Sequence, residues 1–287
     1  MTTKLDLVTP TDASREVSLV PDRERGSGFL LRVNQTDQSY VDLDDPTVLE
    51  FDYIQRMADA IDAFEATSRS IRVIHIGGAG MTLPRYVAVT RPRSPQIVLE
   101  PDEVLTAFVR EHLPLPPRSG IKVRGVGGRE GIAAMRPDYA DVVILDAFNG
   151  ARVPADLVTS EFFAQVSDVL VDSGVFLLNL ADRAPFGYLR RVLAGLGDQF
   201  TTILMSAEPA TFKGRRFGNI LVCASRAAPA HQELAHQELA RKAARSAFPY
   251  RVLTNDIVRR TFAATEPFTD GDSAMSPEPP GGKGFFS

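Results

Sequence analysis

The middle of the chain alternates short apolar runs with segments of helical character, and this alternation restricts the fold more than any other feature. Between residues 70 and 225 the apolar runs are 71–77, 96–100, 121–126, 141–148, 174–180, 201–207 and 219–225. The first five are rich in Val, Ile and Leu with little polar alternation, which is typical of parallel strands buried on both faces. The sequence therefore predicts a doubly wound α/β sheet.

Helix signals lie between these runs. Residues 101–112 place a proline in the first turn and acids near the N-terminus. Residues 159–174 begin with a threonine or serine that suits an N-cap, and they end with a glycine. The last two apolar runs are joined only by residues 211–218, which are too few for a helical crossover. We therefore expect an antiparallel hairpin at one edge of the sheet.

The two ends of the chain differ from this middle region. Residues 26–45 indicate a strand pair with a turn near 34–37, and residues 46–66 have the apolar spacing of a helix. We interpret 1–69 as a small β-rich cap with a linking helix, followed by a sheet domain over 70–264. The repeated HQELA at 231–240 suits a surface helix rather than a repeat architecture. The Pro/Gly-rich residues 265–287 are expected to be disordered.

Composition narrows the class of protein. The chain has 287 residues with 44% hydrophobic residues, enough for a sizeable core. Its formal charge of -4 gives no electrostatic reason to expect nucleic acid or an anionic membrane as partner. No apolar run reaches bilayer length, and the N-terminus lacks the apolar stretch of a secretory signal. One cysteine, Cys223, fits a reducing cytoplasm, and the spacing of the histidines predicts no metal site.

A glycine loop follows the first apolar run. Gly77, Gly78 and Gly80 fit the dinucleotide fingerprint poorly, and the loop lacks the G-K-[ST] of a P-loop. Glu100 ends the second run, where a carboxylate can accept both hydroxyl groups of a ribose. Because the loop contains no basic residue, a nucleoside cofactor without phosphates fits best, such as S-adenosylmethionine or its decarboxylated form. A glycine turn that serves only close packing is the alternative.

Several of these segments resemble a known family. IGGAG, IVLEPDEV, GGREGIAAM, DVVILDAF and SEFF, within 71–180, resemble the polyamine aminopropyltransferases (spermidine synthases), a branch of the S-adenosylmethionine methyltransferase fold. DAFNGARVPADLVTSEFF and KGRRFGN are similar to the spermidine synthase-like group of actinobacterial type. The resemblance implies a seven-stranded Rossmann-like sheet, a cytoplasmic transferase of polyamine biosynthesis, a small-molecule amine substrate and a homodimer to which the N-terminal β region contributes.

The resemblance also implies roles for individual residues. Asp146 would be the general base, and Tyr53 and Asn149 would contact the amine. The residues implied for the cofactor are Gln38, Gly77, Gly78, Gly80, Glu100, Gly127, Asp146 and Ala147.

Four positions depart from the family pattern. The second aspartate of the family is Asn149, the aspartate of the glycine loop is Gly80, and the aspartate near the adenine falls at Gly127 or Gly128. The histidine that follows the family's tyrosine is Ile54. The amine half of the site thus loses most of its expected charge. Two alternatives follow: a non-catalytic binding or assembly module, and a small-molecule methyltransferase.

Other chemically active side chains have plainer interpretations. His75 lies inside an apolar run and is expected to be a hydrogen-bonded core histidine. Cys223 is expected to be a small buried side chain. Asp42, Asp44 and Asp45 suit a solvated turn. Lys213, Arg215 and Arg216 suit a solvated hairpin tip, with the mouth of the site or a dimer partner as the alternative.

Overall fold

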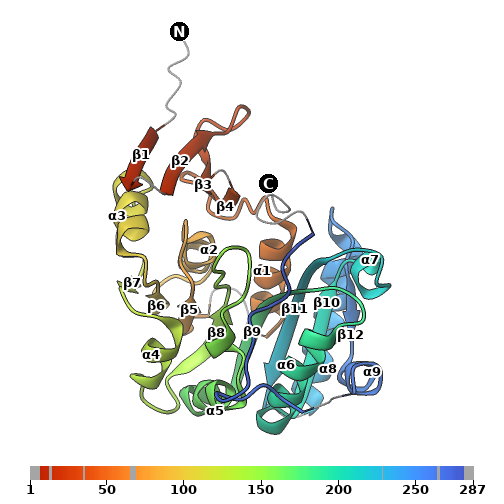
Figure 1. The fold of residues 1–287 in the computed structure, drawn as a ribbon. Helices are drawn as coiled ribbons and strands as arrows, with labels where there is room; N and C mark the ends of the chain where they lie inside the picture. The colour runs from red at the N-terminus through yellow and green to blue at the C-terminus, as the bar shows by residue number, and fades with distance from the viewer. Residues whose placement is uncertain are drawn as a thin grey trace.

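A small antiparallel sheet forms one end of the molecule. The computed structural model describes residues 7–12, 15–34, 36–64, 69–227, 229–263 and 266–280. In this sheet β1 (Leu7–Asp12), β2 (Arg15–Pro21), β3 (Gly28–Val33) and β4 (Thr36–Asp42) pair in chain order. Figure 1 shows the sheet beyond α3 (Glu103–His112) and the edge of the larger sheet. The strand pair predicted in 26–45 is confirmed as β3 and β4.

The larger sheet has eight strands in the order β12-β10-β11-β9-β8-β5-β6-β7 within the described residues. The parallel strands are β5 (Val73–Ile76), β6 (Gln96–Leu99), β7 (Ile121–Arg124), β8 (Ala140–Leu145) and β9 (Leu170–Asp182). The antiparallel strands are β10 (Thr202–Ala207), β11 (Gly218–Ser225) and β12 (Arg251–Leu253). All the predicted strands and the antiparallel hairpin are confirmed.

The structure corrects the predicted edge of the sheet. The short strand β12 pairs with β10, so the β10–β11 hairpin is one strand away from the edge and the sheet has one strand more than predicted. Three residues are too few to produce an apolar pattern that identifies a strand from sequence alone. The pairing depends on the tertiary position of β10.

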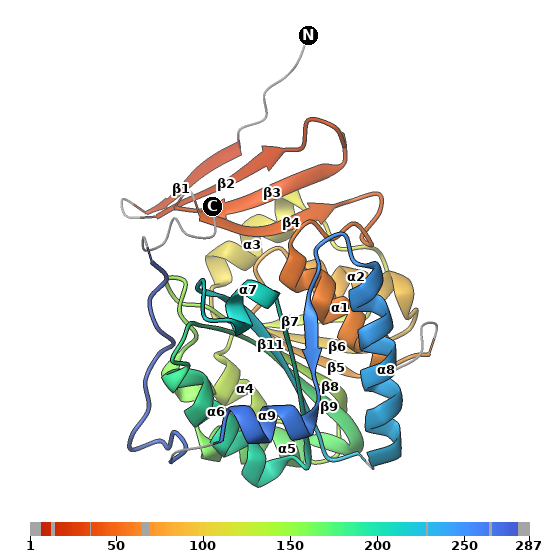
Figure 2. The same cartoon turned by 90° about the vertical axis from the view of Figure 1, so that its right-hand side faces the viewer.

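Helices cover both faces of this sheet (Figure 2). One face carries α1 (Asp52–Phe64), α2 (Thr82–Thr90) and α8 (Pro229–Arg245). The other carries α4 (Gly128–Ala133), α5 (Ser160–Val169), α6 (Gly187–Gln199) and α9 (Asn255–Thr261). Two short helices, η1 (Ala155–Leu157) and α7 (Pro209–Phe212), lie in loops. The linking helix predicted from residue 46 begins at Asp52, and the HQELA repeat lies within the predicted surface helix α8.

Helix α5 ends earlier than its C-terminal glycine suggested. Leu170 has extended backbone angles and pairs with Ala140 of β8, so the chain enters β9 directly after Val169. Pairing with a neighbouring strand thus overrides the local helix signal.

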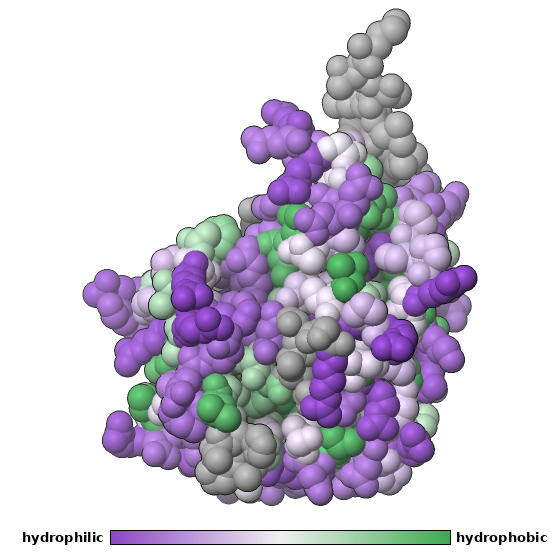
Figure 3. All heavy atoms as spheres, turned by 180° about the vertical axis from the view of Figure 1, so that it is seen from behind, coloured by the Kyte–Doolittle hydropathy of each residue, from purple (hydrophilic) through white to green (hydrophobic). Residues whose placement is uncertain are grey.

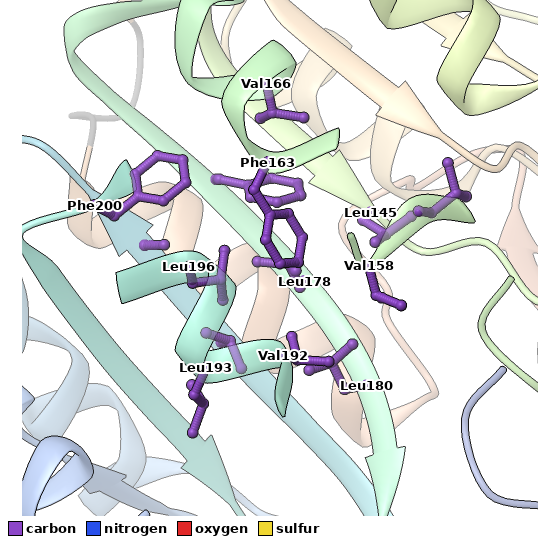
Figure 4. Packing of buried hydrophobic residues seen from close by; sticks show 14 of the residues in the cluster. Leu145, Val158, Phe163, Val166, Leu178, Leu180, Val192, Leu193, Leu196 and Phe200 are labelled. Carbon is purple, nitrogen blue, oxygen red and sulfur yellow. The ribbon is translucent and has the colours of Figure 1, made fainter. Parts of the chain in front are cut away.

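The core between the sheet and α5/α6 contains a cluster of phenylalanine side chains. Phe162, Phe163, Phe176 and Phe200 are almost completely buried, and neighbouring rings lie 6.0–6.5 Å apart. Figure 4 shows Phe163 next to Leu178, with Leu196 and Phe200 beside them. Burial of each such side chain contributes roughly 1.5–3 kcal/mol. This core fixes α5 and the carboxyl ends of β8 and β9.

A buried charge network holds the opposite helix layer. Asp62 of α1 accepts hydrogen bonds from the Tyr86 hydroxyl (2.9 Å), Arg91 (2.8 Å) and Lys242 of α8 (3.1 Å). Lys242 also pairs with Asp59 of α1 (3.2 Å). Since Arg91 is fully buried, removing its partner would leave an uncompensated charge. The network therefore fixes α1, the helix that begins beside the cavity described below.

The N-terminal sheet packs its apolar face on α3. Val17, Leu19 and Leu31 share a buried cluster with Phe108 and Val109. Two hydrogen bonds then tie β4 to the start of α2: Gly80 N to Ser39 Oγ (3.0 Å) and Thr82 Oγ1 to the carbonyl oxygen of Tyr40 (2.7 Å). These contacts bring β4 over the carboxyl ends of β5 and β6.

The C-terminal tail is a correction to the sequence interpretation. Residues 266–280 pack against the domain, and the side chains of Phe268 and Ser276 are 3% and 0% exposed. Composition alone predicted disorder because it contains no information on contacts with residues distant in sequence. Here Arg129 and Arg191 form ion pairs with Asp270 and Asp272. Residues 265 and 281–287 lie outside the described residues.

The surface is mixed in character. On the face seen from behind, hydrophobic residues form small groups among hydrophilic ones (Figure 3). Among the helices that the structure describes, none has the length and apolar content required to cross a bilayer.

Candidate functional site

A cavity of about 1180 Å³ opens at the carboxyl ends of the central strands, beneath β4. Open α/β sheets bind ligands in this crevice, and the volume slightly exceeds the usual range for one small ligand. It is lined by nine of the predicted site residues: Gln38, Tyr53, Gly77, Gly78, Glu100, Gly127, Asp146, Ala147 and Asn149. The remaining predicted residue, Gly80, is not part of the lining.

The glycine loop is shaped by its contact with β8. Gly77 has φ +96°, in the left-handed region, and a Cβ atom there would overlap the carbonyl oxygen of Asp146. At Gly78 a Cβ atom would lie 3.1 Å from the Cβ of Glu100. Glycine at these two positions allows the loop to pass close to the ends of both neighbouring strands.

Gly80 serves the N-terminal sheet rather than the cavity. Its amide donates to Ser39 Oγ, and its carbonyl oxygen accepts from Arg85 Nε (3.2 Å). A Cβ atom at this position would lie 2.7 Å from the Cβ of Ser39. An aspartate, the residue of the family pattern, would therefore require β4 to shift, which explains this departure.

The Glu100 carboxylate faces the cavity and supports the glycine loop. Oε2 accepts from the amides of Gly78 (2.8 Å) and Ala79 (3.4 Å), and Oε1 accepts from the amide of Asp102 (3.0 Å). An ionised carboxylate has about four acceptor positions, so capacity remains for a ligand hydroxyl. Glu100 is half-buried in the cavity wall.

The loop before α4 leaves space for a flat group. A Cβ atom on Gly127 would meet no heavy atom within 4 Å, whereas one on Gly128 would overlap Ile76 and approach Leu157. Gly127 therefore borders open cavity, while Gly128 closes the packing behind it. Leu99 and Leu157 add apolar lining. A cradle of this shape fits a planar heterocycle such as adenine.

Asp146 is the most perturbed acid of the cavity. It follows β8, and its Oδ1 accepts a hydrogen bond from Asn179 Nδ2 on β9 (3.0 Å). Burial raises the pKa of Asp146 to about 6, although the hydrogen bond from Asn179 acts in the opposite direction. A carboxyl group with this pKa is suited to general-base catalysis near neutral pH.

The amine-contact residues implied by the resemblance are only partly brought together. Tyr53 lines the cavity from the start of α1, and burial, followed by the charges of Asp146 and Asp52, raises its pKa well above the usual value. Its phenol therefore stays neutral. Ile54 is 5% exposed and belongs to the core, and Asn149 lies exposed in a turn at the cavity mouth.

The cavity contains more negative charge than the family positions suggested. Eight carboxylates line it, against one arginine, Arg216. They are Asp37, Glu50, Asp52, Glu100, Asp102, Asp146, Asp156 and Glu208. Apart from Glu100 and Asp146, sequence interpretation missed these acids as site residues. The position of Asp52 directly before Tyr53 was an available signal, whereas Glu208 reaches the cavity only through the β10–β11 connection.

Three of these acids have cationic neighbours, and the first of them, Asp37, pairs through Oδ1 with Nε of Arg32 at 2.6 Å. Asp52 Oδ2 lies 3.4 Å from Nη2 of Arg56, a side chain that is 3% exposed. Glu208 Oε2 lies 3.0 Å from Nη1 of Arg216, which is half exposed. These three cations reduce the local negative potential, but the lining as a whole remains anionic. Such a cavity favours cationic ligands.

The plainer interpretations of His75 and Cys223 are confirmed. His75 is 2% exposed and pairs with Gln96 through Nε2 (2.8 Å), and burial lowers its pKa to about 4. Burial raises the pKa of the Cys223 thiol to about 12. The predicted solvated turn holds for the exposed Asp44 and Asp45 but is wrong for Asp42, which is 2% exposed and accepts hydrogen bonds from Ser27 and from the amides of both. In the described part of the chain no three His, Cys, Asp or Glu side chains form a metal-binding group.

Several known proteins resemble this chain, and their names indicate one family. No family model matches the chain. A polyamine aminopropyltransferase of Vibrio vulnificus is 30% identical over 110 residues, which span 38% of this chain and 37% of that protein. One of Neisseria meningitidis is 23% identical over 204 residues, spanning 70% of this chain and 73% of the relative. The solved structure of a probable spermidine synthase from Corynebacterium glutamicum superposes with a TM-score of 0.80 at 28% identity, covering 90% of this chain and 94% of that one.

Proposed function

Because this chain belongs to the spermidine synthase-like family of the methyltransferase fold, we propose that it transfers an aminopropyl group to a polyamine-type amine. One observation carries the proposal: Asp146, with its pKa raised to about 6, faces a cavity lined by eight carboxylates and one arginine. The co-substrate is a sulfonium and the acceptor an ammonium compound, so the lining attracts both.

Glu100 and the glycine loop would hold the adenosyl part of the co-substrate. The free acceptor capacity of Glu100 suits the ribose hydroxyls, and the space at Gly127 suits the adenine ring. When bound, the sulfonium supplies an electrophilic carbon for the amine. Decarboxylated S-adenosylmethionine fits better than the intact form, because the single lining arginine is already paired with Glu208. The intact form would place its own carboxylate among acids.

Asp146 would take the proton that the attacking ammonium must lose. Its raised pKa narrows the gap to that of an alkylammonium group, which favours this transfer. Tyr53 stays neutral beside it and can position the amine. Asp52 and Glu208 replace the charge absent at Asn149 and attract the distal ammonium, each contributing about 1–4 kcal/mol near a surface.

The alternative of a non-catalytic binding module has one structural feature in its favour. Two positions that carry polar groups in the family pattern are unavailable here, since Ile54 belongs to the core and Gly80 packs on Ser39. A binding module would hold the adenosyl ligand without turning over an amine. Substrate turnover therefore separates the two functions.

Isothermal titration and a product assay test the proposal. We expect binding of methylthioadenosine and of decarboxylated S-adenosylmethionine, with intact S-adenosylmethionine at least tenfold weaker. With putrescine as acceptor, the wild-type chain should form product. Asp146→Asn should bind the same ligands and form none, while the exposed surface variant Asp172→Asn should behave as wild type. Binding without turnover would favour the module, and an absence of binding would refute both functions.

We further propose that the chain is a cytoplasmic homodimer, with the N-terminal sheet at the interface, as the resemblance implies. Light scattering on the purified protein should give twice the mass of one chain. A monomer at micromolar concentration would contradict this.

A further inference from the structure

The C-terminal segment 266–280, here called the strap, runs along the sheet domain toward the N-terminal sheet (Figures 1 and 2). Its first part is anchored in the core. The carbonyl oxygen of Phe268 accepts from the amide of Ser160 (2.9 Å), and its ring lies 5.4 Å from that of Tyr188. The guanidinium of Arg191 stacks over the same ring, 4.0 Å from the centroid.

The middle of the strap is held by charged side chains. Asp270 forms a bidentate pair with Arg129 (2.7 and 2.6 Å) and accepts from the hydroxyl of Thr159 (2.8 Å). Asp272 pairs with Arg191 (2.6 Å). The bidentate geometry fixes the orientation of the strap more than it adds to the free energy of unfolding, because these ion pairs are partly exposed to solvent. They guide the chain toward the cavity wall.

The end of the strap bonds to the two residues that directly follow the cavity-lining residues 149–151. The Ser276 amide donates to the carbonyl oxygen of Val153 (3.2 Å), and Ser276 Oγ accepts from the amide of Val153 (2.9 Å). Arg152 donates through Nη2 to the carbonyl oxygen of Met275 (3.3 Å) and through Nε to that of Ser276. Val153 and Ser276 are both fully buried. Loss of a hydrogen bond between them would therefore leave a buried polar group without a partner and without access to water.

The anchored residues follow a strained turn. Asn149 and Arg152 exchange backbone hydrogen bonds of 2.8 and 3.3 Å, and the residues between them, Gly150 and Ala151, have φ 60° and 67°. Two left-handed central residues define a type I′ turn. Ala151 has a Cβ atom, so its left-handed conformation persists only where neighbouring structure enforces it. Asn149, Gly150 and Ala151 line the cavity mouth.

We propose that the strap positions this wall of the acceptor site, with Arg152 and Ser276 as the positioning residues. The identity of the ligand behind the wall rests on the proposed function, but the mechanical link does not. The link joins positions 123 residues apart in sequence. Without it, the turn would relax from its left-handed conformation and the amine would meet a mobile wall, while the adenosyl end, formed by Glu100 and the glycine loop, would stay in place.

Hydrogen exchange and kinetics on the full chain test the link. In Ser276→Ala and Arg152→Ala, amide exchange over residues 149–154 should be at least tenfold faster than in wild type. The KM for putrescine should rise at least fivefold, and the Kd for methylthioadenosine should stay within twofold. Asp272→Ala is the matched control, because it removes a strap contact to Arg191 rather than to the turn, and it should change none of these values.

Each outcome decides the proposal. Unchanged exchange over 149–154 in both variants would overturn the link. Faster exchange with an unchanged KM for putrescine would overturn the positioning role. If the wild-type chain makes no product, the proposed function fails. The hydrogen-exchange measurement then still supports or refutes the contact between the strap and the turn.

Discussion

The backbone carbonyl oxygen of Asp146 occupies the space that a Cβ atom on Gly77 would need. The glycine loop after β5 and the end of β8 are therefore in direct contact, and the absence of a side chain at position 77 lets Asp146 lie beside the glycine loop. This relationship links the geometry of the site to the stability of the sheet.

Gly77→Ala should lower the free energy of unfolding by more than about 1 kcal/mol, because both the positive φ and the overlap oppose a side chain. Gly127→Ala is the matched control. Its backbone is extended and a Cβ atom there meets nothing, so its stability should equal that of wild type while adenosyl binding weakens. Urea unfolding and titration with methylthioadenosine measure both. Equal stability of the two variants would contradict the contact with Asp146.

The rate of transfer should rise with pH through about 6. Asp146 must be ionised to accept a proton, and its pKa is raised to about 6 by burial. Below that value log kcat/KM should fall with a slope near one, as measured in a pH–rate profile. A flat profile between pH 5 and 7 would exclude Asp146 as the base.

Asp146→Asn should unfold at a higher temperature than wild type at pH 7.5. A carboxyl group whose folded-state pKa lies above its unfolded value contributes stability at low pH, and this is lost as pH rises through about 6. The asparagine side chain does not ionise and so avoids that loss of stability. The difference in unfolding temperature between the two proteins should therefore shrink below about pH 4, near the ordinary pKa of aspartate. Thermal scans at several pH values test this sign, and a difference that grows toward acid pH would refute it.

Glu208→Gln should raise the KM for putrescine roughly three- to tenfold, since it removes one cavity charge worth about 1 kcal/mol after screening by Arg216. Arg216→Gln should act in the opposite direction, because it leaves Glu208 without its counter-charge. Steady-state kinetics should therefore show changes of opposite sign in the KM for putrescine for the two variants. A rise in KM for both variants would show that the ion pair supports the loop rather than attracts the amine.

Gly80→Asp, which restores the residue of the family pattern, should destabilise the protein and not increase turnover. The Cβ atom would lie 2.7 Å from that of Ser39, so the aspartate cannot point into the cavity without moving β4. Thermal unfolding and the putrescine assay check both parts. Faster turnover with normal stability would contradict the assignment of Gly80 to the contact with the N-terminal sheet.

The strands of the larger sheet were predictable because buried parallel strands leave continuous apolar runs, as in β5 and β8. Glu100 and Asp146 were predictable because each ends such a strand, and parallel strands end at the same edge of a sheet. These features are local in sequence and need no knowledge of the packing.

The remaining features depend on contacts between distant segments. Glu208 reaches the cavity through the arrangement of β10 and β11, and Gly80 owes its role to Ser39 in another sheet. The strap looks disordered by composition, yet Phe268 and Ser276 find buried partners. No pattern within a single segment reports such partners.

A crystal soaked with methylthioadenosine tests the central claim most directly. The account predicts density across the carboxyl ends of β5 and β6, with the ribose hydroxyls within hydrogen-bonding distance of the Glu100 carboxylate and the adenine ring over Gly127. Density elsewhere, or none at saturating ligand, would contradict it.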